Sequence, residues 1–233
     1  MTALTFPPLM QGEAAAGDAL DHAARQAALG CASGLVVHRI AADRAEAALV
    51  LAPEVPLRDA MAMLPLCGVG FQNALGALAP PEVAVHLTWA GGLRVNGAAC
   101  GHMAVRASGT DPDAVPGWLV VGWSLALIPD AEGGHDPERT ALYAEGCADV
   151  DPGTLVEAWA RHSLNWIARW EAEGVRPLAD EWRGLAHGIG ETATGGGRTG
   201  TFLGVDEAFG MILRDEAGAT HLIPLTTLLE DVP

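Results

Sequence analysis

VAVHLTWAGGLRVNGAACGHMAVRA, residues 83–107, predicts three strands in succession. The runs Val83–Trp89, Leu93–Val95 and Cys100–Ala107 are rich in β-branched and apolar residues, as strands are. Asn96–Gly97 separates the second run from the third, and Asn-Gly favours the positive φ angles of a type I′ turn. We therefore expect antiparallel strands here, joined by a tight hairpin turn.

Further strand signals flank this segment on both sides. Upstream, Leu35–Ile40 and Ala45–Leu51 are separated only by the polar stretch Ala41–Arg44, which predicts another hairpin. Downstream, Trp118–Leu127 is almost continuously apolar, the pattern of a strand covered on both faces. We expect a polar loop, Asp130–Glu138, to follow it.

Helical patterns lie between the strands. Ala14–Leu29 is rich in alanine and is followed by Gly30, a common residue just past a helix end. Leu57–Leu78 has helical periodicity but contains Pro65, so we expect a kink or break at that residue.

A long helix is predicted after Asp151-Pro152, where Asp is the N-cap and Pro occupies the first helical position. It should run to Glu173 and place Leu155, Trp159, Trp166 and Trp170 on one face, packed in the core. A shorter helix is expected over Leu178–Leu185.

The C-terminal part has a different pattern. Gly188–Thr199 is rich in Gly and Thr, and we place a domain boundary there, between residues 1–187 and 188–233. Three short strands are expected after it: Gly200–Val205, Gly210–Arg214 and Thr220–Ile223. A segment of this size predicts a small SH3-like β-barrel. The overall fold class is thus α+β, a mixed sheet packed with helices and followed by this barrel.

The composition excludes several classes of function. The formal net charge is −16, from 29 acidic and 13 basic residues, which argues against nucleic acid or an anionic membrane surface as partner. All the basic residues are arginine, so Schiff-base and lysine-base chemistry are excluded. The four cysteines are widely spaced and no His pair has zinc spacing, so we expect reduced thiols, no metal site and a cytoplasmic protein.

Three short motifs could carry chemistry but favour structural interpretations. Gly195–Arg198 lacks the strand, helix and Lys of a phosphate loop, and we interpret it as a flexible linker. Gly122–Ala126 resembles a nucleophile elbow without the following helix, which leaves Ser124 as a strand residue. Cys100 and His102 should share a sheet face, near His86, as a buried thiol and a satisfied histidine.

From Val83 onward the order of elements resembles the biotin protein ligase family and its lipoate ligase and octanoyltransferase relatives. In that family a Lys-Trp-Pro-Asn-Asp segment, a hairpin and a Lys three residues before a Gly form the catalytic core. The matching stretches here are 88–92, 93–97 and 98–101. Residues 118–122, 141–151, 170–182 and 200–210 resemble the later family segments. The resemblance covers about the whole chain.

This chain departs from the family at the positions that the resemblance assigns to catalysis. Thr88 and Ala98 stand where the family has lysines. The long Gly/Arg-rich loop that covers the adenylate is reduced to about Ala41–Arg44. Each lost charge contact typically removes several kcal/mol of transition-state stabilisation, so adenylation by the family's mechanism is not expected. The motifs support no biotin, lipoate or ATP binding, and we expect no cofactor.

Two hypotheses follow from the resemblance, ahead of a conventional ATP-dependent ligase. The first is a non-catalytic protein that binds a small carboxylic or acyl ligand, or an acyl-carrier or biotinyl-type domain, and forms a homodimer. The second is an acyltransferase that uses Cys147, which falls near the catalytic Cys of the octanoyltransferases. The predicted ligand-binding residues are Thr88, Trp89, Asn96, Ala98, Cys100, Gly101, Gly122 and Trp123.

Overall fold

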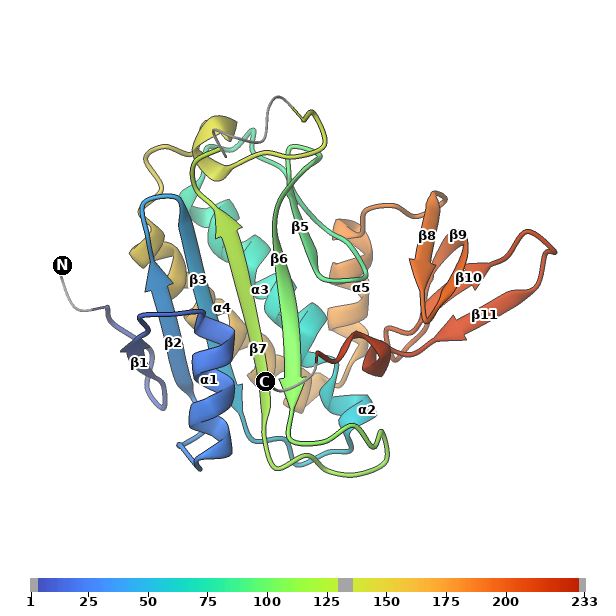
Figure 1. The fold of residues 1–233 in the computed structure, drawn as a ribbon, viewed down its shortest axis with the longest axis horizontal. Coiled ribbons are helices and arrows are strands. Elements are labelled where there is room, and N and C mark those ends of the chain that lie inside the picture. The colour runs from blue at the N-terminus through green and yellow to red at the C-terminus, as the bar shows by residue number, and fades with distance from the viewer. Residues whose placement is uncertain (1–3, 130–135, 231–233) are drawn as a thin grey trace.

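A seven-stranded sheet forms the larger part of the fold (Figure 1). The computed structural model describes residues 4–129 and 136–230. The strand order is β1-β2-β3-β7-β6-β5-β4, parallel between β1 and β2 and antiparallel between all other neighbours. The strands are β1 (Gln11–Ala14), β2 (Leu35–Ile40), β3 (Arg44–Leu51), β4 (Val85–Leu87), β5 (Gly92–Val95), β6 (Ala98–Ala107) and β7 (Leu119–Ala126).

Helices cover both faces of this sheet (Figure 1). Helix α1 packs on one face, over β2, β3 and β7, and encloses a small core of Ala and Val side chains. Helices α3 and α4 pack against each other and against the opposite face, where the main core lies. The helices are α1 (Ala19–Ala28), α2 (Leu57–Ala60), α3 (Met63–Leu78), the 3-10 turn η1 (Leu142–Glu145), α4 (Pro152–Glu173) and α5 (Arg176–Leu185).

The C-terminal part forms a separate four-stranded antiparallel sheet beside the first one (Figure 1). It consists of β8 (Thr192–Gly195), β9 (Arg198–Val205), β10 (Met211–Arg214) and β11 (Thr220–Ile223), followed by the 3-10 turn η2 (Leu225–Leu228). This small antiparallel domain is consistent with an SH3-like barrel, and the predicted α+β class is confirmed. The exact boundary near residue 188 stays a prediction.

The first predicted helix begins later than expected. Gln11–Ala14 forms β1, and Ala15 continues the pairing by donating its N–H to His38 O at 2.8 Å. The helix begins only after Asp18, whose carboxylate accepts the N–H of Asp21 at 2.8 Å. The prediction from Ala14 was wrong because pairing with β2 and the Asp18 cap outweigh the helix propensity of the alanines.

The helical segment 57–78 breaks as predicted, but at a different place. Met61 and Ala62 separate α2 from α3, and Pro65 lies in the first turn of α3. A proline fits there because the first-turn N–H groups have no partner within the helix. Leu57–Leu78 is long and apolar enough to cross a membrane by length and composition, with 72% of its most apolar window buried in the fold, as in a core helix.

The predicted hairpins and the central strand are confirmed. Asn96 and Gly97 have φ angles of 49° and 90°, as a type I′ turn requires. β2 and β3 form the expected hairpin, with Ala41 N donating to Arg44 O at 2.8 Å. β7 is covered on both faces over its first part, where Leu119 and Val121 face the main core and Val120 faces the core beneath α1. The predicted loop Asp130–Glu138 lies mostly outside the described residues.

The long helix α4 also forms as predicted. Asp151 caps it by accepting the N–H of Thr154 at 2.8 Å, and Pro152 occupies its first position. Trp159 and Trp166 are buried in the main core, and Trp170 packs against its margin. The spacing of the tryptophans therefore reflects packing.

The Gly-rich stretch after α5 is ordered structure rather than a linker. Gly195 ends β8, Gly196 and Gly197 form the turn with φ angles of 54° and 73°, and Arg198 begins β9. The interpretation as a flexible linker was wrong because glycines that permit a tight hairpin turn resemble linker glycines in sequence.

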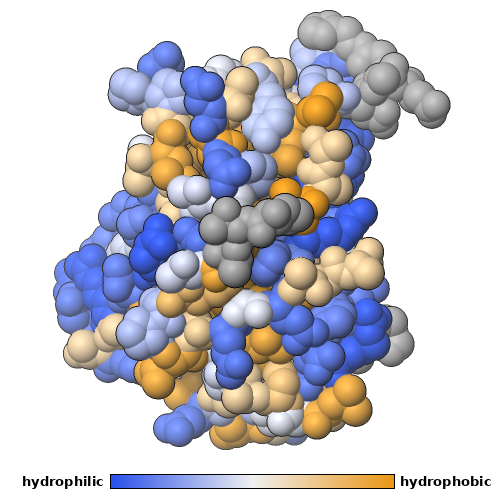
Figure 2. Space-filling model, turned by 90° about the vertical axis from the view of Figure 1, so that its left-hand side faces the viewer, coloured by the Kyte–Doolittle hydropathy of each residue, from blue (hydrophilic) through white to orange (hydrophobic). Residues whose placement is uncertain are grey.

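The side of the molecule that carries β1 is shown in Figure 2. Apolar and hydrophilic residues are interspersed over this face. The edge strand β1 exposes Gln11, Gly12 and Ala14, whereas Glu13 is partly buried and lies 2.5 Å from His22 on α1. The homodimer stays a prediction.

Candidate functional site

Polar residues form a row across the sheet beneath the N-terminus of α1. Glu46 on β3 pairs in register with Ser124 on β7, and Ser124 pairs with His102 on β6. The neighbouring row contains only small residues: Ala48, Gly122 and Ala104. The two rows together form the floor of the site. A ligand above it would contact the polar groups of one row and would have room above the small residues of the other.

A cavity of about 80 Å³ lies over this floor. A Cβ on Gly122 would lie 3.1 Å from Leu20 Cδ1, so the glycine lets α1 approach the sheet closely. Most of the other lining residues are polar or charged: Asp18, Glu46, His102, Arg106, Ser124 and Glu230. A partly open polar cavity between a helix N-terminus and a sheet is the best candidate site among the described residues.

Glu46 is the most buried charged residue of this cavity, with 6% of its surface exposed. Its carboxylate accepts the N–H of Ala19 at 3.2 Å and lies 3.0 Å from Arg39 Nη1. The free N–H groups and the dipole at a helix N-terminus favour a negative charge. Glu46 therefore fills the anion-binding position at the start of α1 with a carboxylate of the chain itself.

The other cations near the cavity also have partners. Arg44 donates to Ser124 Oγ at 2.9 Å. Arg106 forms ion pairs with Asp21 on α1 and with Glu230. Glu230 directly follows Leu229, which forms an isolated β-bridge with Val105. Within residues 4–129 and 136–230, no group of three His, Cys, Asp or Glu side chains could hold a metal ion.

The predicted pocket residues fall in separate places. Gly122 and Trp123 line the cavity beneath α1, although the indole of Trp123 packs edge-on against Phe71 and Trp159 in the main core. Gly101 belongs to β6, and the structure gives it a packing role. A Cβ there would lie 2.2 Å from Ser124 O on β7.

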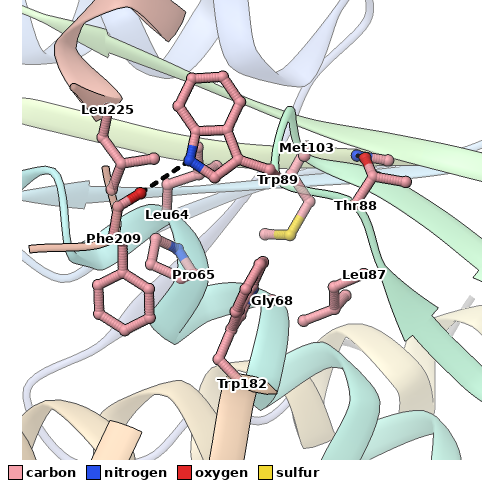
Figure 3. A pocket seen from close by; sticks show the side chains of 12 residues that line it. Leu64, Pro65, Gly68, Leu87, Thr88, Trp89, Met103, Trp182, Phe209 and Leu225 are labelled. Carbon is pink, nitrogen blue, oxygen red and sulfur yellow. Dashed lines mark hydrogen bonds between the residues drawn. The ribbon is translucent and has the colours of Figure 1, made fainter. Parts of the chain in front are cut away.

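Thr88 and Trp89 lie at the junction of the two sheets (Figure 3). Trp89 donates its indole N–H to Phe209 O at 2.7 Å, and the ring packs near Trp182 and Met103. The remaining space is only about 20 Å³ and almost entirely apolar. Thr88 closes the β4–β5 turn, because its hydroxyl accepts the N–H of Gly92 at 2.8 Å. Trp89 thus joins the C-terminal domain to the larger sheet, whereas Thr88 stabilises the turn beside it.

The prediction that Cys100 and His102 share a sheet face was wrong. Leu93 pairs with Gly101 and Arg94 pairs with Ala99, so Cys100 is the extra residue of a β-bulge. A bulge interrupts the alternation of faces, and Cys100 is buried in the main core while His102 is exposed. Burial raises the pKa of the Cys100 thiol to about 12.

The remaining predicted residues meet at the other end of the sheet. Asn96 accepts the N–H of Ala84 through Oδ1 at 3.0 Å and donates to Glu145 at 2.8 Å. Ala98 begins β6, next to this turn. Cys147 is 0% exposed, with its thiol 3.9 Å from Glu145 O. These residues pack the loop before α4 against the sheet.

Cys147 should react with iodoacetamide in the native protein much more slowly than Cys31, as the other buried thiols, Cys67 and Cys100, should. Burial, and then the carboxylates of Glu145 and Glu82, raise the pKa of its thiol, so thiolate appears only at higher pH than in an ordinary cysteine. Cys31 is partly exposed and should react first. Mass spectrometry after timed alkylation at neutral pH measures the order.

The same chain unfolded in urea is the control, since all four thiols should then react alike. An octanoyl adduct after incubation with octanoyl carrier protein, lost on Cys147→Ser, would contradict this expectation and revive the acyltransferase hypothesis.

Glu46, Arg106, Asp18 and Glu230 were missed by sequence reasoning. A signal was available for Glu46 and Arg106. Each is a charged residue within a predicted strand that is otherwise mostly apolar, Ala45–Leu51 for Glu46 and Cys100–Ala107 for Arg106. A buried charge requires a partner, so these positions indicate a polar site.

Comparisons with known proteins agree with this fold. A sequence model of the biotin/lipoate A/B protein ligase family matches residues 6–184, and a domain of unknown function matches residues 189–231. A biotin–[acetyl-CoA-carboxylase] ligase of Paracoccus denitrificans is 27% identical over 179 residues, 73% of each chain.

Solved structures add two relatives. A biotin protein ligase-like protein of unknown function from Silicibacter sp. TM1040 is 62% identical, with a TM-score of 0.93 over 98% of this chain and 100% of that one. The biotin protein ligase of Aquifex aeolicus is 15% identical, with a TM-score of 0.73 over 94% and 96% of the two chains, and shares the fold.

Proposed function

Since this chain belongs to the biotin/lipoate A/B protein ligase family, we propose that it binds a small carboxylic or acyl ligand without activating that ligand through ATP. The ligand would occupy the cavity beneath α1. A biotinyl-type or lipoyl-type carrier domain is the protein partner that the family suggests.

The observation that carries this proposal is the size and charge of the cavity. About 80 Å³ holds a few heavy atoms, whereas pockets for drug-sized ligands measure about 300–1,000 Å³. An acyl-adenylate needs a pocket of the larger class. The space supports a ligand fragment of the size of a short carboxylic acid.

The charges around the cavity also argue against activation of the ligand through ATP. Forming an acyl-adenylate requires cations placed where the phosphate charge develops. The chain has no lysine, and Arg39 and Arg106 already pair with Glu46, Asp21 and Glu230. A triphosphate would meet the carboxylates of Asp18, Glu46 and Glu230 at this cavity, which disfavours its binding.

The test is to incubate the purified protein with ATP and biotin, lipoate or octanoate and to measure pyrophosphate release. We expect release at the background rate, whereas the Paracoccus denitrificans ligase, as the positive control, should release pyrophosphate with biotin. Isothermal titration of the same acids without ATP should show binding of at least one. An acyl-AMP product in the reaction mixture would refute the proposal.

A further inference from the structure

Arg106 is the cation of the cavity beneath α1, and its guanidinium is only partly used. The side chain is 12% exposed. Nη1 donates to the Asp21 carboxylate on α1, and Nη2 lies 3.5 Å from Glu230 Oε2. Nε is buried and has no acceptor among the residues that the structure describes. An unpartnered buried donor of a charged group is unfavourable, so this N–H requires an explanation.

The geometry of the guanidinium group offers an explanation for the unpartnered Nε–H of Arg106. Nε and Nη2 present two parallel N–H groups whose spacing matches the two oxygens of a carboxylate. Charge-assisted bonds of this kind are typically about 2.7–2.9 Å long. Glu230 reaches only Nη2, at 3.5 Å, and leaves Nε without a partner. The pair with Glu230 is therefore a poor substitute for a bidentate carboxylate.

Glu230 is also the partner of Arg106 that can leave most easily. Its side chain is 47% exposed, and its backbone is held by one N–H bond to Val105 O at 3.1 Å beside the Leu229–Val105 bridge. Asp21, in contrast, belongs to the first turn of α1, which is packed on the sheet. Moving the Glu230 side chain away from Arg106 breaks one long ion pair and does not require α1 to move.

We propose that the ligand binds head-first, with its carboxylate on Nε and Nη2 of Arg106, and that Glu230 holds this place when no ligand is bound. This inference rests on the proposed function, and it names the chemical class: a monocarboxylate. Replacing one carboxylate by another leaves the net charge of the cavity unchanged. A phosphate head would add negative charge beside Asp18 and Glu46.

The experiment follows the Nε–H resonance of Arg106 by NMR in protein with isotope-labelled arginine. The resonance is assigned by its absence from the Arg106→Lys spectrum, and this variant keeps the charge beside Asp21 but loses the parallel pair of donors. The probes are acetate, which is the carboxylate head alone, and octanoate. The protein is compared with Glu230→Gln and with Glu216→Gln, a control that removes an exposed carboxylate from the β10–β11 turn.

We expect acetate to shift this resonance, with half-saturation at about two- to fivefold lower concentration in Glu230→Gln, the range for loss of a partly exposed ion pair. Glu216→Gln should match the unmodified protein. Octanoate should bind Arg106→Lys about tenfold or more weakly, because a bidentate charged contact is lost.

The outcomes separate this inference from the proposed function. If octanoate binds while the Arg106 resonance stays in place, the inference is wrong and the proposed function stands. If acetate moves the resonance while biotin, lipoate and octanoate all fail to bind, the carboxylate site stands and the proposed acyl ligand is wrong. An Nε–H resonance unmoved by either probe in Glu230→Gln refutes the inference.

Discussion

Trp159→Ala should lower the free energy of unfolding by about 3–5 kcal/mol, the usual range for removal of a buried tryptophan. Trp159 is 0% exposed and lies on α4 against α3 and the sheet. Its indole N–H donates to Cys67 O at 3.1 Å, and its ring packs edge-on against Trp123 at a centroid distance of 5.9 Å. Truncation thus creates a cavity and leaves a buried carbonyl without its donor.

Urea unfolding, monitored by circular dichroism, measures the loss in the free energy of unfolding. The matched control is Trp170→Ala on the same helix, where the ring is partly exposed and about 1 kcal/mol is expected. Trp159→Phe keeps most of the ring packing and loses only the hydrogen bond, so it should fall between the two. Equal losses for Trp159→Ala and Trp170→Ala would show that the α3–α4 contact is not the centre of the core.

The turns and helix starts that have characteristic residues could be predicted from the sequence. Asn96–Gly97 specifies its turn through the positive φ angles it permits, and Asp151-Pro152 specifies the start of α4 through a cap and a fixed φ. β1 was missed because Gln11–Ala14 has no strand pattern, and only its pairing with β2 makes it a strand. Such pairing is a property of the tertiary fold.

The candidate site was harder to predict than the fold. Trp89, Gly122 and Trp123 were expected around one pocket, but Trp89 lies at the junction of the two sheets, whereas Gly122 and Trp123 line the cavity beneath α1. The cavity is built from register across β3, β7 and β6, and from Glu230 at the end of the chain. No short sequence motif indicates the register between strands that lie so far apart in the sequence.

Thr88 and Ala98, the positions where the resemblance expects lysines, both lie at turns in the structure. Thr88 uses its hydroxyl to close the β4–β5 turn, and a Cβ on Gly92 would lie 2.7 Å from that oxygen. Ala98 begins β6 beside the Asn96 turn. The Thr88 side chain therefore serves the geometry of the β4–β5 turn.

Gly101→Ala should destabilise the protein by about 3 kcal/mol, the upper end of the range for overpacking. The added Cβ would lie 2.2 Å from Ser124 O and 3.1 Å from Leu125 Cα, and both are backbone atoms of β7 that no side-chain rotation can move. β6 and β7 would have to separate at the row that carries Ser124 and His102. The cavity floor should therefore distort along with the sheet.

Gly109→Ala is the matched control, because a Cβ there has nothing within 4 Å and the residue needs no positive φ. This variant should be more stable by about 0.4–1 kcal/mol, through the lower entropy of its unfolded chain. Opposite shifts of the urea midpoint for the two substitutions are the expected result. A Gly101→Ala protein as stable as the parent would mean that β6 and β7 lie farther apart here, and the packing explanation for this glycine would give way to a role in ligand binding.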